Sequence, residues 1–238
     1  MPDSDDIVVE LRGVQKNYYG LRPLRIQQLD IHAGGSIALL GLDQAAAEVL
    51  VNLITAATTP DEGEVRAFGK LTTAIADAET WLHSLDAFGI LSERAVLLDN
   101  MTVGQNLTIP FSLSLHDVPD DVRSKVQALA EEVGLPATEF NLPVGALTPS
   151  SRLRLRLGRA LALGPRVLLS EHPNAALAPE AVGAFAADYS RIVSARGIAS
   201  LVLTADRAFA TAIAPRVLTL QPATGEIKPL SGWRRWFS

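Results

Sequence analysis

A strand-to-helix turn near the start of the chain is where phosphate chemistry is first expected. The apolar run Ser36-Ile-Ala-Leu-Leu reads as a buried strand, Gly41 follows it, and good helix formers begin near Ala45. A phosphate-binding loop needs glycines whose backbone N–H groups wrap the anion, a lysine for the β- and γ-phosphates, and a Ser or Thr hydroxyl for magnesium. Gly41-Leu-Asp-Gln-Ala-Ala-Ala-Glu-Val has only the first glycine, so taken alone it predicts an ordinary connection.

Two further side chains that could do chemistry follow the apolar strand Val167-Leu-Leu-Ser. Glu171 could hold a cation, and His172 could act as a base tuned near neutrality. Because no lysine or magnesium-binding hydroxyl accompanies them, we expect instead that Glu171 hydrogen-bonds the turn at Gly41 and that His172 is packed or touches solvent. No histidine pair has the spacing of metal ligands, so no metal site is predicted.

Strands that alternate with helices must position these residues. Strands are expected at 7–11, 24–31, 36–40, 63–69, 88–92, 166–170, 199–204, 217–220 and 227–230, and helices at 45–56, 79–85, 103–113, 119–133, 149–163 and 179–195. This alternation predicts an α/β fold with a three-layer core, a parallel sheet and ligand loops at the carboxyl ends of its strands. The stretch 102–140 reads as a helical insert.

Composition excludes several classes of protein. The 238 residues are 48% hydrophobic and 20% charged, and the net charge of −5 offers no overall basic surface for nucleic acid. No apolar run approaches the roughly 18 residues of a membrane helix. The chain has no cysteine, and its acidic start is the reverse of a signal peptide, so a cytoplasmic protein is expected.

The order and spacing of several segments resemble the ATP-binding subunits of ABC transporters, over nearly the whole chain. The turn after Gly35 looks like the Walker A segment GxxGxGK[ST][ST], with Ala47 at the lysine and Glu48 at the magnesium-binding hydroxyl. The resemblance implies a P-loop NTPase-like three-layer core with an antiparallel β subdomain and a helical insert. It assigns a degenerate nucleotide loop to Tyr18, where an aromatic would stack on adenine, and to Gly41, Asp43, Gln44, Ala47, Glu48 and Val49.

The residues aligned with the family's hydrolytic positions are also altered. Glu93 stands at the Q-loop glutamine, and Walker B, which would end in Asp-Glu, has Glu171 and His172. The switch histidine is replaced by Ala205, and the D-loop aspartate by Ala178. The resemblance therefore implies that Glu93, Glu171, His172 and Ala205 are vestigial positions and that no catalytic set is intact.

The signature-like segment Leu147-Thr-Pro-Ser-Ser stands where the family has LSGGQ. Thr148 and Pro149 make a good helix start. Subunits of this family pair head to tail, so Thr148, Ser150 and Ser151 would face the nucleotide of a partner subunit. The arginines of the following helix are expected to form a solvated face: Arg152, Arg154, Arg156 and Arg159.

The altered turn is expected to bind ATP weakly or not at all. Asp43 and Glu48 are predicted at the amino end of a helix, where carboxylates satisfy free N–H groups in place of phosphate. Each would oppose ATP by about 3–4 kcal/mol at an effective dielectric of about 20. Stacking on Tyr18, which is otherwise a half-buried strand-edge aromatic, would recover only about 1–3 kcal/mol.

The resemblance, with these substitutions, implies a non-catalytic, pseudo-ATPase subunit of an ABC transporter. It would form a hetero-oligomer with an active ABC ATPase subunit and dock on an integral-membrane permease at the inner face of the cell membrane. ATP and magnesium would be shared only through the active partner. Two alternatives stay open: an ATP-hydrolysing subunit with Glu171 on the metal and His172 as base, and a soluble scaffold or regulator.

Four segments are expected along the chain. They are an N-terminal core at 1–92, a Q-loop-like segment with the helical insert and signature at 93–162, the rest of the core at 163–230, and an aromatic, basic tail at 231–238. The permease would dock around residues 93–106, where Leu97, Leu98 and Met101 either meet it or pack internally. The tail suits a membrane interface, a partner groove or its own domain.

Overall fold

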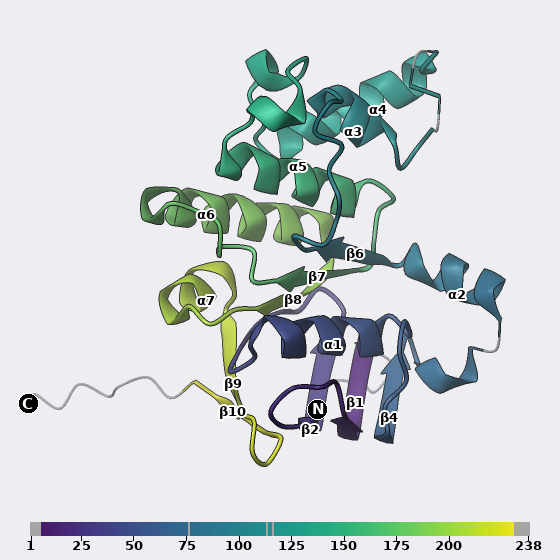
Figure 1. Cartoon of the computed structure of the whole chain (residues 1–238), viewed down its shortest axis with the longest axis vertical. Helices are drawn as coiled ribbons and strands as arrows, with labels where there is room; N and C mark the ends of the chain where they lie inside the picture. Colours follow the sequence, from purple (N-terminus) through teal and green to yellow (C-terminus); the bar gives the residue numbers. More distant parts are fainter. Residues whose placement is uncertain (1–5, 76, 113, 116, 231–238) are drawn as a thin grey trace, which may run out of the picture.

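Two β-sheets and a layer of helices make up residues 6–75, 77–112, 114–115 and 117–230, which the computed structural model describes (Figure 1). The larger sheet has six strands in the order β10-β9-β3-β8-β7-β6, and the smaller has four in the order β2-β1-β4-β5. Neighbours from β9 to β6 run parallel, whereas β10 and the smaller sheet are antiparallel. The predicted α/β class with an antiparallel subdomain is confirmed.

Most elements lie where the sequence predicts them. The strands are β1 (Ile7–Lys16), β2 (Leu24–His32), β3 (Ser36–Leu40), β4 (Glu62–Ala67), β5 (Lys70–Leu71), β6 (Phe88–Leu91), β7 (Val167–Glu171), β8 (Ala199–Leu203), β9 (Arg216–Gln221) and β10 (Glu226–Pro229). The helices are α1 (Gln44–Ile54), α2 (Ala78–Leu85), α3 (Val103–Thr108), α4 (Asp120–Glu132), α5 (Pro149–Leu161), α6 (Pro179–Arg196) and α7 (Arg207–Ile213).

Helix α3 is shorter than predicted. The pattern at 103–113 predicts a longer helix, but α3 ends at Thr108. Pro110 has no N–H to donate to the carbonyl four residues earlier, so the helical hydrogen-bond ladder stops there. A capping box fixes its start, in which Thr102 and Gln105 bond each other's backbone N–H groups at 3.1 and 2.9 Å.

Two apolar cores lie on opposite faces of the six-stranded sheet. Helix α1 packs between this sheet and the four-stranded sheet, through buried residues such as Leu50 and Leu53 (Figure 1). Helices α5, α6 and α7 cover the other face, where Leu157, Phe185 and Phe209 are buried. The helical insert and the four-stranded sheet therefore lie at opposite ends of the molecule, with the predicted turn between them.

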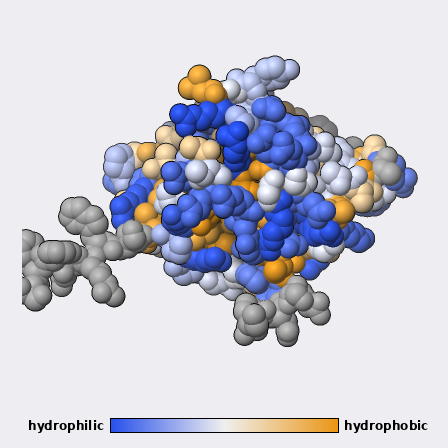
Figure 2. Space-filling view, turned by 90° about the horizontal axis from the view of Figure 1, so that it is seen from below, coloured by the Kyte–Doolittle hydropathy of each residue, from blue (hydrophilic) through white to orange (hydrophobic). Residues whose placement is uncertain are grey.

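The surface at the four-stranded end is mostly hydrophilic. Seen from below, apolar groups show only in small areas between polar side chains (Figure 2). Within the described ranges, none of the helices is both long enough and apolar enough to cross a bilayer.

The buried tyrosine of α6 makes stability depend on alkaline pH. The Tyr189 hydroxyl lies 2.9 Å from Ser170 Oγ, and burial raises the pKa of Tyr189 to about 12. An unfolded tyrosine has a pKa of about 10. Its contribution to stability is therefore complete below pH 10 and is lost as the pH rises towards 12, because only the unfolded chain releases the proton.

We expect Tyr189→Phe to flatten this alkaline loss. The variant should lose about 1 kcal/mol at pH 8, where the hydrogen bond is missing. It should also lack about 2–3 kcal/mol of the decline that the parent shows between pH 10 and 12. Urea unfolding at several pH values measures both effects, and Tyr19→Phe is the exposed control. If the free energy of unfolding falls by the same amount between pH 10 and 12 in Tyr189→Phe and in the parent, the prediction is contradicted.

Candidate functional site

The turn after β3 leads into a helix whose third amide is already bonded by a side chain. Asp43 is the N-cap of α1, and its Oδ1 accepts the N–H of Ala46 at 2.8 Å. The N–H of Ala47 donates to the Asp43 carbonyl at 2.9 Å. Ala47 is fully buried, so its methyl group is part of the core rather than of an open loop. As predicted, a carboxylate occupies the amino end of this helix.

Gly41 has a structural role independent of any ligand. Its φ is +102°, and a Cβ added there would lie 2.4 Å from the carbonyl oxygen of Leu220. This approach brings the end of β3 against β9. The glycine is therefore required by backbone packing alone.

The prediction that Glu48 sits at the amino end of the helix is wrong. Because α1 begins at Gln44, Glu48 lies one turn further along, where the N–H groups are bonded within the helix. Its Oε1 instead lies 3.3 Å from Nη1 of Arg94, in the loop after β6. The carboxylate is thus directed across to the six-stranded sheet rather than along the helix axis.

Glu171, at the end of β7, is bonded to the same arginine. Its side chain is fully buried, and Arg94 donates to both of its oxygens, from Nε to Oε2 at 3.1 Å and from Nη2 to Oε1. The Ser92 hydroxyl donates to Oε2 at 2.6 Å. The expected contact between Glu171 and the turn at Gly41 is therefore replaced by a contact with the loop after β6.

Arg94 is the functional residue that sequence reasoning missed. The hydrogen bonds that Arg94 donates to Glu171 raise the pKa of Arg94, and the charges of Glu171 and Glu48 add to this effect. We call Glu48, Arg94 and Glu171 the carboxylate–guanidinium cluster. A buried carboxylate that ends an apolar strand needs a cation, and Arg94 in the run Ser92-Glu-Arg supplies one, whereas the turn at residues 41–49 contains no lysine. The requirement of Glu171 for a compensating cation was the feature of the sequence that could have indicated Arg94.

His172 is half-buried and held in an unusual backbone conformation. Its φ is +43°, which is uncommon for a residue with a side chain, and its N–H donates to the Leu203 carbonyl at 2.8 Å. Among the described residues, no partner contacts its buried Nε2. Ala205 lies in the loop after β8 and is exposed. Ala178 is the N-cap residue of α6 and makes no side-chain hydrogen bond to the helix.

Glu93 projects from the loop after β6 and is exposed. With Pro149, Arg156 and Glu171 it lines a pocket whose free space is about 10 Å³, room for one water molecule. The described residues contain no group of three or more His, Asp or Glu side chains arranged to hold a metal ion.

The signature-like residues divide between surface and interior. Thr148 is the N-cap of α5, and its Oγ1 accepts the Ser151 N–H at 3.2 Å. Ser151 is 7% exposed and its hydroxyl accepts a hydrogen bond from Thr148, so it does not face outward as expected. Thr148 is exposed and Ser150 half-exposed, and only these two could meet a partner.

Tyr18 lies beside the same turn. Burial raises its pKa, and the negative charge of Asp43 raises it further, which places the phenol near the cap of α1. Its ring packs under Gly20, where a Cβ would lie 2.7 Å from Cε2 of the ring. Tyr19 and Leu21 project fully into solvent from this loop.

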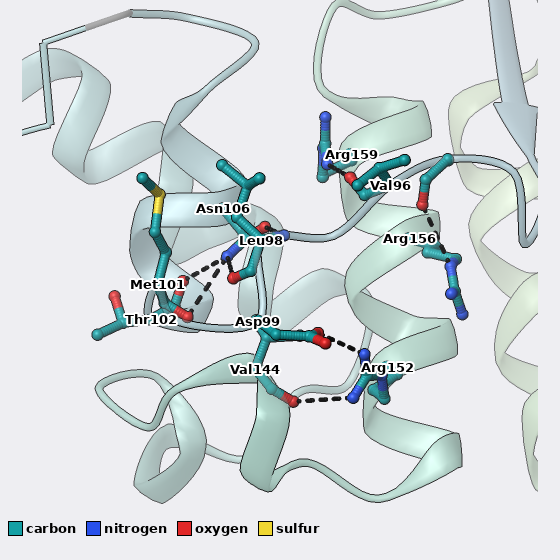
Figure 3. A network of polar contacts seen from close by, with 11 residues as sticks. Val96, Leu98, Asp99, Met101, Thr102, Asn106, Val144, Arg152, Arg156 and Arg159 are labelled. Carbon is teal, nitrogen blue, oxygen red and sulfur yellow. Dashed lines mark hydrogen bonds and ion pairs between the residues drawn. The ribbon is translucent and has the colours of Figure 1, made fainter.

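The arginines of α5 do not form the predicted solvated face. Arg152 donates to Asp99 Oδ1 at 2.5 Å, Arg156 to the Ala95 carbonyl at 3.4 Å and Arg159 to the Val96 carbonyl at 2.5 Å (Figure 3). Arg154 turns elsewhere, to Asp188 and the Val133 carbonyl, both at 2.7 Å. Burial lowers the pKa of Arg156 and Arg159. Alternation along a helix cannot reveal such partners, because they lie far away in the sequence.

The residues expected to meet a permease differ in exposure. Leu97 is 8% exposed and belongs to the apolar core. Leu98 and Val96 are 39% and 71% exposed on the same stretch. The aromatic tail lies outside the described residues.

The fold is that of an ATP-binding cassette: a parallel core, an antiparallel subdomain, and a helix that begins after the central strand. Two solved structures share the fold. CbiO1 from Clostridium perfringens, part of the ABC transporter complex cbiONQ, gives a TM-score of 0.80 at 18% identity, over 94% of this chain and 87% of that chain. The bacterial ABC transporter cassette MJ0796, in a dimeric structure, gives a TM-score of 0.77 at 21% identity, over 94% of this chain and 100% of that chain.

The chain belongs to the ABC transporter family, whose model matches residues 24–175. It is similar to the glutamine transport ATP-binding protein GlnQ of Bacillus subtilis, 25% identical over 89% of this chain and 86% of that protein. The methionine import ATP-binding protein MetN of Clostridium acetobutylicum is 27% identical over 94% of this chain and 70% of its own length. The Fe(3+) ions import ATP-binding protein FbpC of Mesorhizobium japonicum is 26% identical over 90% of this chain and 58% of its own length.

Proposed function

We propose that this chain is a non-catalytic subunit of an ABC transporter, which pairs with an active ATPase subunit and docks on a membrane permease. The observation that supports it best is the carboxylate–guanidinium cluster. Glu48 and Glu171 stand at the positions aligned with the magnesium-binding hydroxyl and the Walker B aspartate, and Arg94 bonds or contacts both. A cation of the chain itself thus lies between the two groups that would bind magnesium.

The residues of the turn do not fit a bound nucleotide with magnesium. The Asp43 carboxylate already accepts one of the free N–H groups of α1, that of Ala46, and it would repel phosphate. No lysine is present at the aligned position, and Ala47 there is buried. Both oxygens of Glu171 are bonded within the protein, so a metal would have to displace Arg94. These contacts disfavour the alternative in which the chain hydrolyses ATP with Glu171 bound to a metal and His172 acting as the base.

The nucleotide site of the partner subunit would use the start of α5 in this chain. Thr148 and Ser150 lie at the exposed start of α5, in the signature-like segment. In a head-to-tail pair they would close on nucleotide held by the active subunit, whose own Walker segments supply the chemistry. One competent site and one closed site would result.

Docking on a permease is proposed for the loop after β6, where Val96 and Leu98 are exposed. The relatives are named for glutamine transport and for methionine and Fe(3+) import, which favours an import system here as well. We include two further points in this proposal. The chain is divided into segments that end at residues 92, 162, 230 and 238, and the protein lies at the inner face of the cell membrane.

The isolated chain is expected not to bind or hydrolyse ATP. Titration calorimetry with millimolar ATP and magnesium should show no saturable heat, and phosphate release should equal the buffer blank. His172→Ala should change neither measurement. Turnover that His172→Ala abolishes would establish the active-enzyme alternative and defeat the proposal.

The pairing is tested by purifying the chain together with the transporter subunits encoded beside it. We expect a complex whose ATPase activity disappears when the partner's general base is replaced and persists when His172 of this chain is replaced by alanine. Recovery of the chain as a monomer, with neither ATPase nor permease bound, would favour the scaffold alternative.

A further inference from the structure

The segment 94–99, here called the connecting segment, joins β6 to the helical insert. It has no regular secondary structure, and such loops are ordinarily among the more mobile parts of a protein. In this chain, however, each of its ends is bonded to a different part of the molecule.

The first end is bonded to the core. Arg94 donates twice to Glu171 of β7 and contacts Glu48 of α1 at 3.3 Å. The Arg94 N–H donates to Ser92 Oγ at 3.1 Å, and Ser92 itself donates to Glu171. This end is therefore fixed to both α1 and β7, through the carboxylate–guanidinium cluster.

The other end is bonded to α3, at the start of the helical insert, and to α5 and the turn before it. The Asn106 side chain of α3 accepts the Leu98 N–H at 2.9 Å and donates to the Leu98 carbonyl at 3.1 Å. Asp99 accepts from Arg152 of α5 at 2.5 Å, and its carbonyl accepts the Gly145 N–H at 3.0 Å. Figure 3 shows Asn106 and Arg152 approaching the segment from two sides.

The middle of the connecting segment is held by α5. Arg159 donates to the Val96 carbonyl at 2.5 Å and Arg156 to the Ala95 carbonyl at 3.4 Å, while Leu97 is buried beneath them. Charged donors bind carbonyl oxygens more strongly than neutral donors do. The segment is thus bonded along its length and has little freedom to change shape alone.

We propose that the connecting segment is a permanent brace, with Arg94 as its core attachment, that holds the helical insert in one orientation on the core without nucleotide. The independence from nucleotide rests on the proposed function, because it requires that the carboxylate–guanidinium cluster, and not a bound nucleotide, joins α1 to β7. The brace itself follows from the contacts alone.

Spin-label distances test the brace directly. The chain has no cysteine, so Lys70→Cys on the four-stranded sheet and Glu131→Cys on α4, both exposed, give one specific label pair. We expect a single narrow distance distribution in the parent, unchanged by millimolar ATP and magnesium. Arg94→Met should broaden or split it, while Arg123→Met, an exposed arginine on α4, should not.

Different results overturn different parts of the inference. A broad distribution in the parent, or a narrow one that Arg94→Met leaves unchanged, would show that the segment is no brace. If the parent's distance shifts with ATP, independence from nucleotide fails. If calorimetry detects ATP binding without a shift, the proposed function fails and the brace stands. Should Arg94→Met alone not fold, the double variant Arg94→Met with Glu171→Gln releases the core end without leaving an unpaired buried charge, and no broadening in it would overturn the brace.

Discussion

Replacing Arg94 with methionine is expected to lower the free energy of unfolding by about 3 kcal/mol, measured by urea denaturation. The change leaves the carboxylate of Glu171, whose side chain is fully buried, without its cation. The value lies at the low end for a broken buried ion pair because the Arg94 side chain is 38% exposed and water can partly replace it. Arg123→Met, at an exposed pair, should cost less than about 0.5 kcal/mol.

A double-mutant cycle separates the ion pair from the packing of the arginine side chain. Glu171→Gln keeps a group that can accept from Ser92 but removes the charge that needs compensation. In that background Arg94→Met should cost only about 1 kcal/mol, which gives a coupling energy of about 2 kcal/mol. An equal cost in both backgrounds would mean that Arg94 stabilises by its packing and not by its charge.

Replacing Gly41 with alanine is expected to destabilise the chain by about 3 kcal/mol, or to prevent folding. The φ of +102° is unfavourable for alanine, and the methyl group would lie 2.4 Å from the Leu220 carbonyl oxygen, which belongs to a strand that cannot yield cheaply. Thermal unfolding in the absence of any nucleotide measures the effect. It tests whether this glycine, the one kept from the phosphate-loop pattern, is needed for packing.

Gly69→Ala is the matched control for Gly41→Ala. Gly69 also has a positive φ, +79°, but nothing lies within 4 Å of the position its Cβ would take. Backbone strain alone should therefore cost about 1–2 kcal/mol. Equal losses at Gly41 and Gly69 would contradict a role for the close approach to Leu220.

The features that the sequence predicted correctly depend on short-range order. Asp43 caps α1 and Thr148 caps α5, because a cap and the amide it binds are three residues apart. Strand and helix positions follow the period of apolar residues in the same way, so the α/β class could be predicted. The end of α3 was missed although Pro110 was visible, because the apolar pattern continues past it.

The sequence by itself determined the fold class, the helix caps and the absence of a lysine from the turn that follows Gly41. The tertiary structure alone decided where the remaining charges go. Arg94 and Glu171 are 77 positions apart, and Arg152 and Asp99 are 53 apart. Which charge meets which depends on how strands and helices pack, since a buried carboxylate takes whichever cation the fold brings within reach. For this reason Glu48, predicted at the amino end of the helix, and Glu171, predicted to bond the turn at Gly41, are instead joined by Arg94.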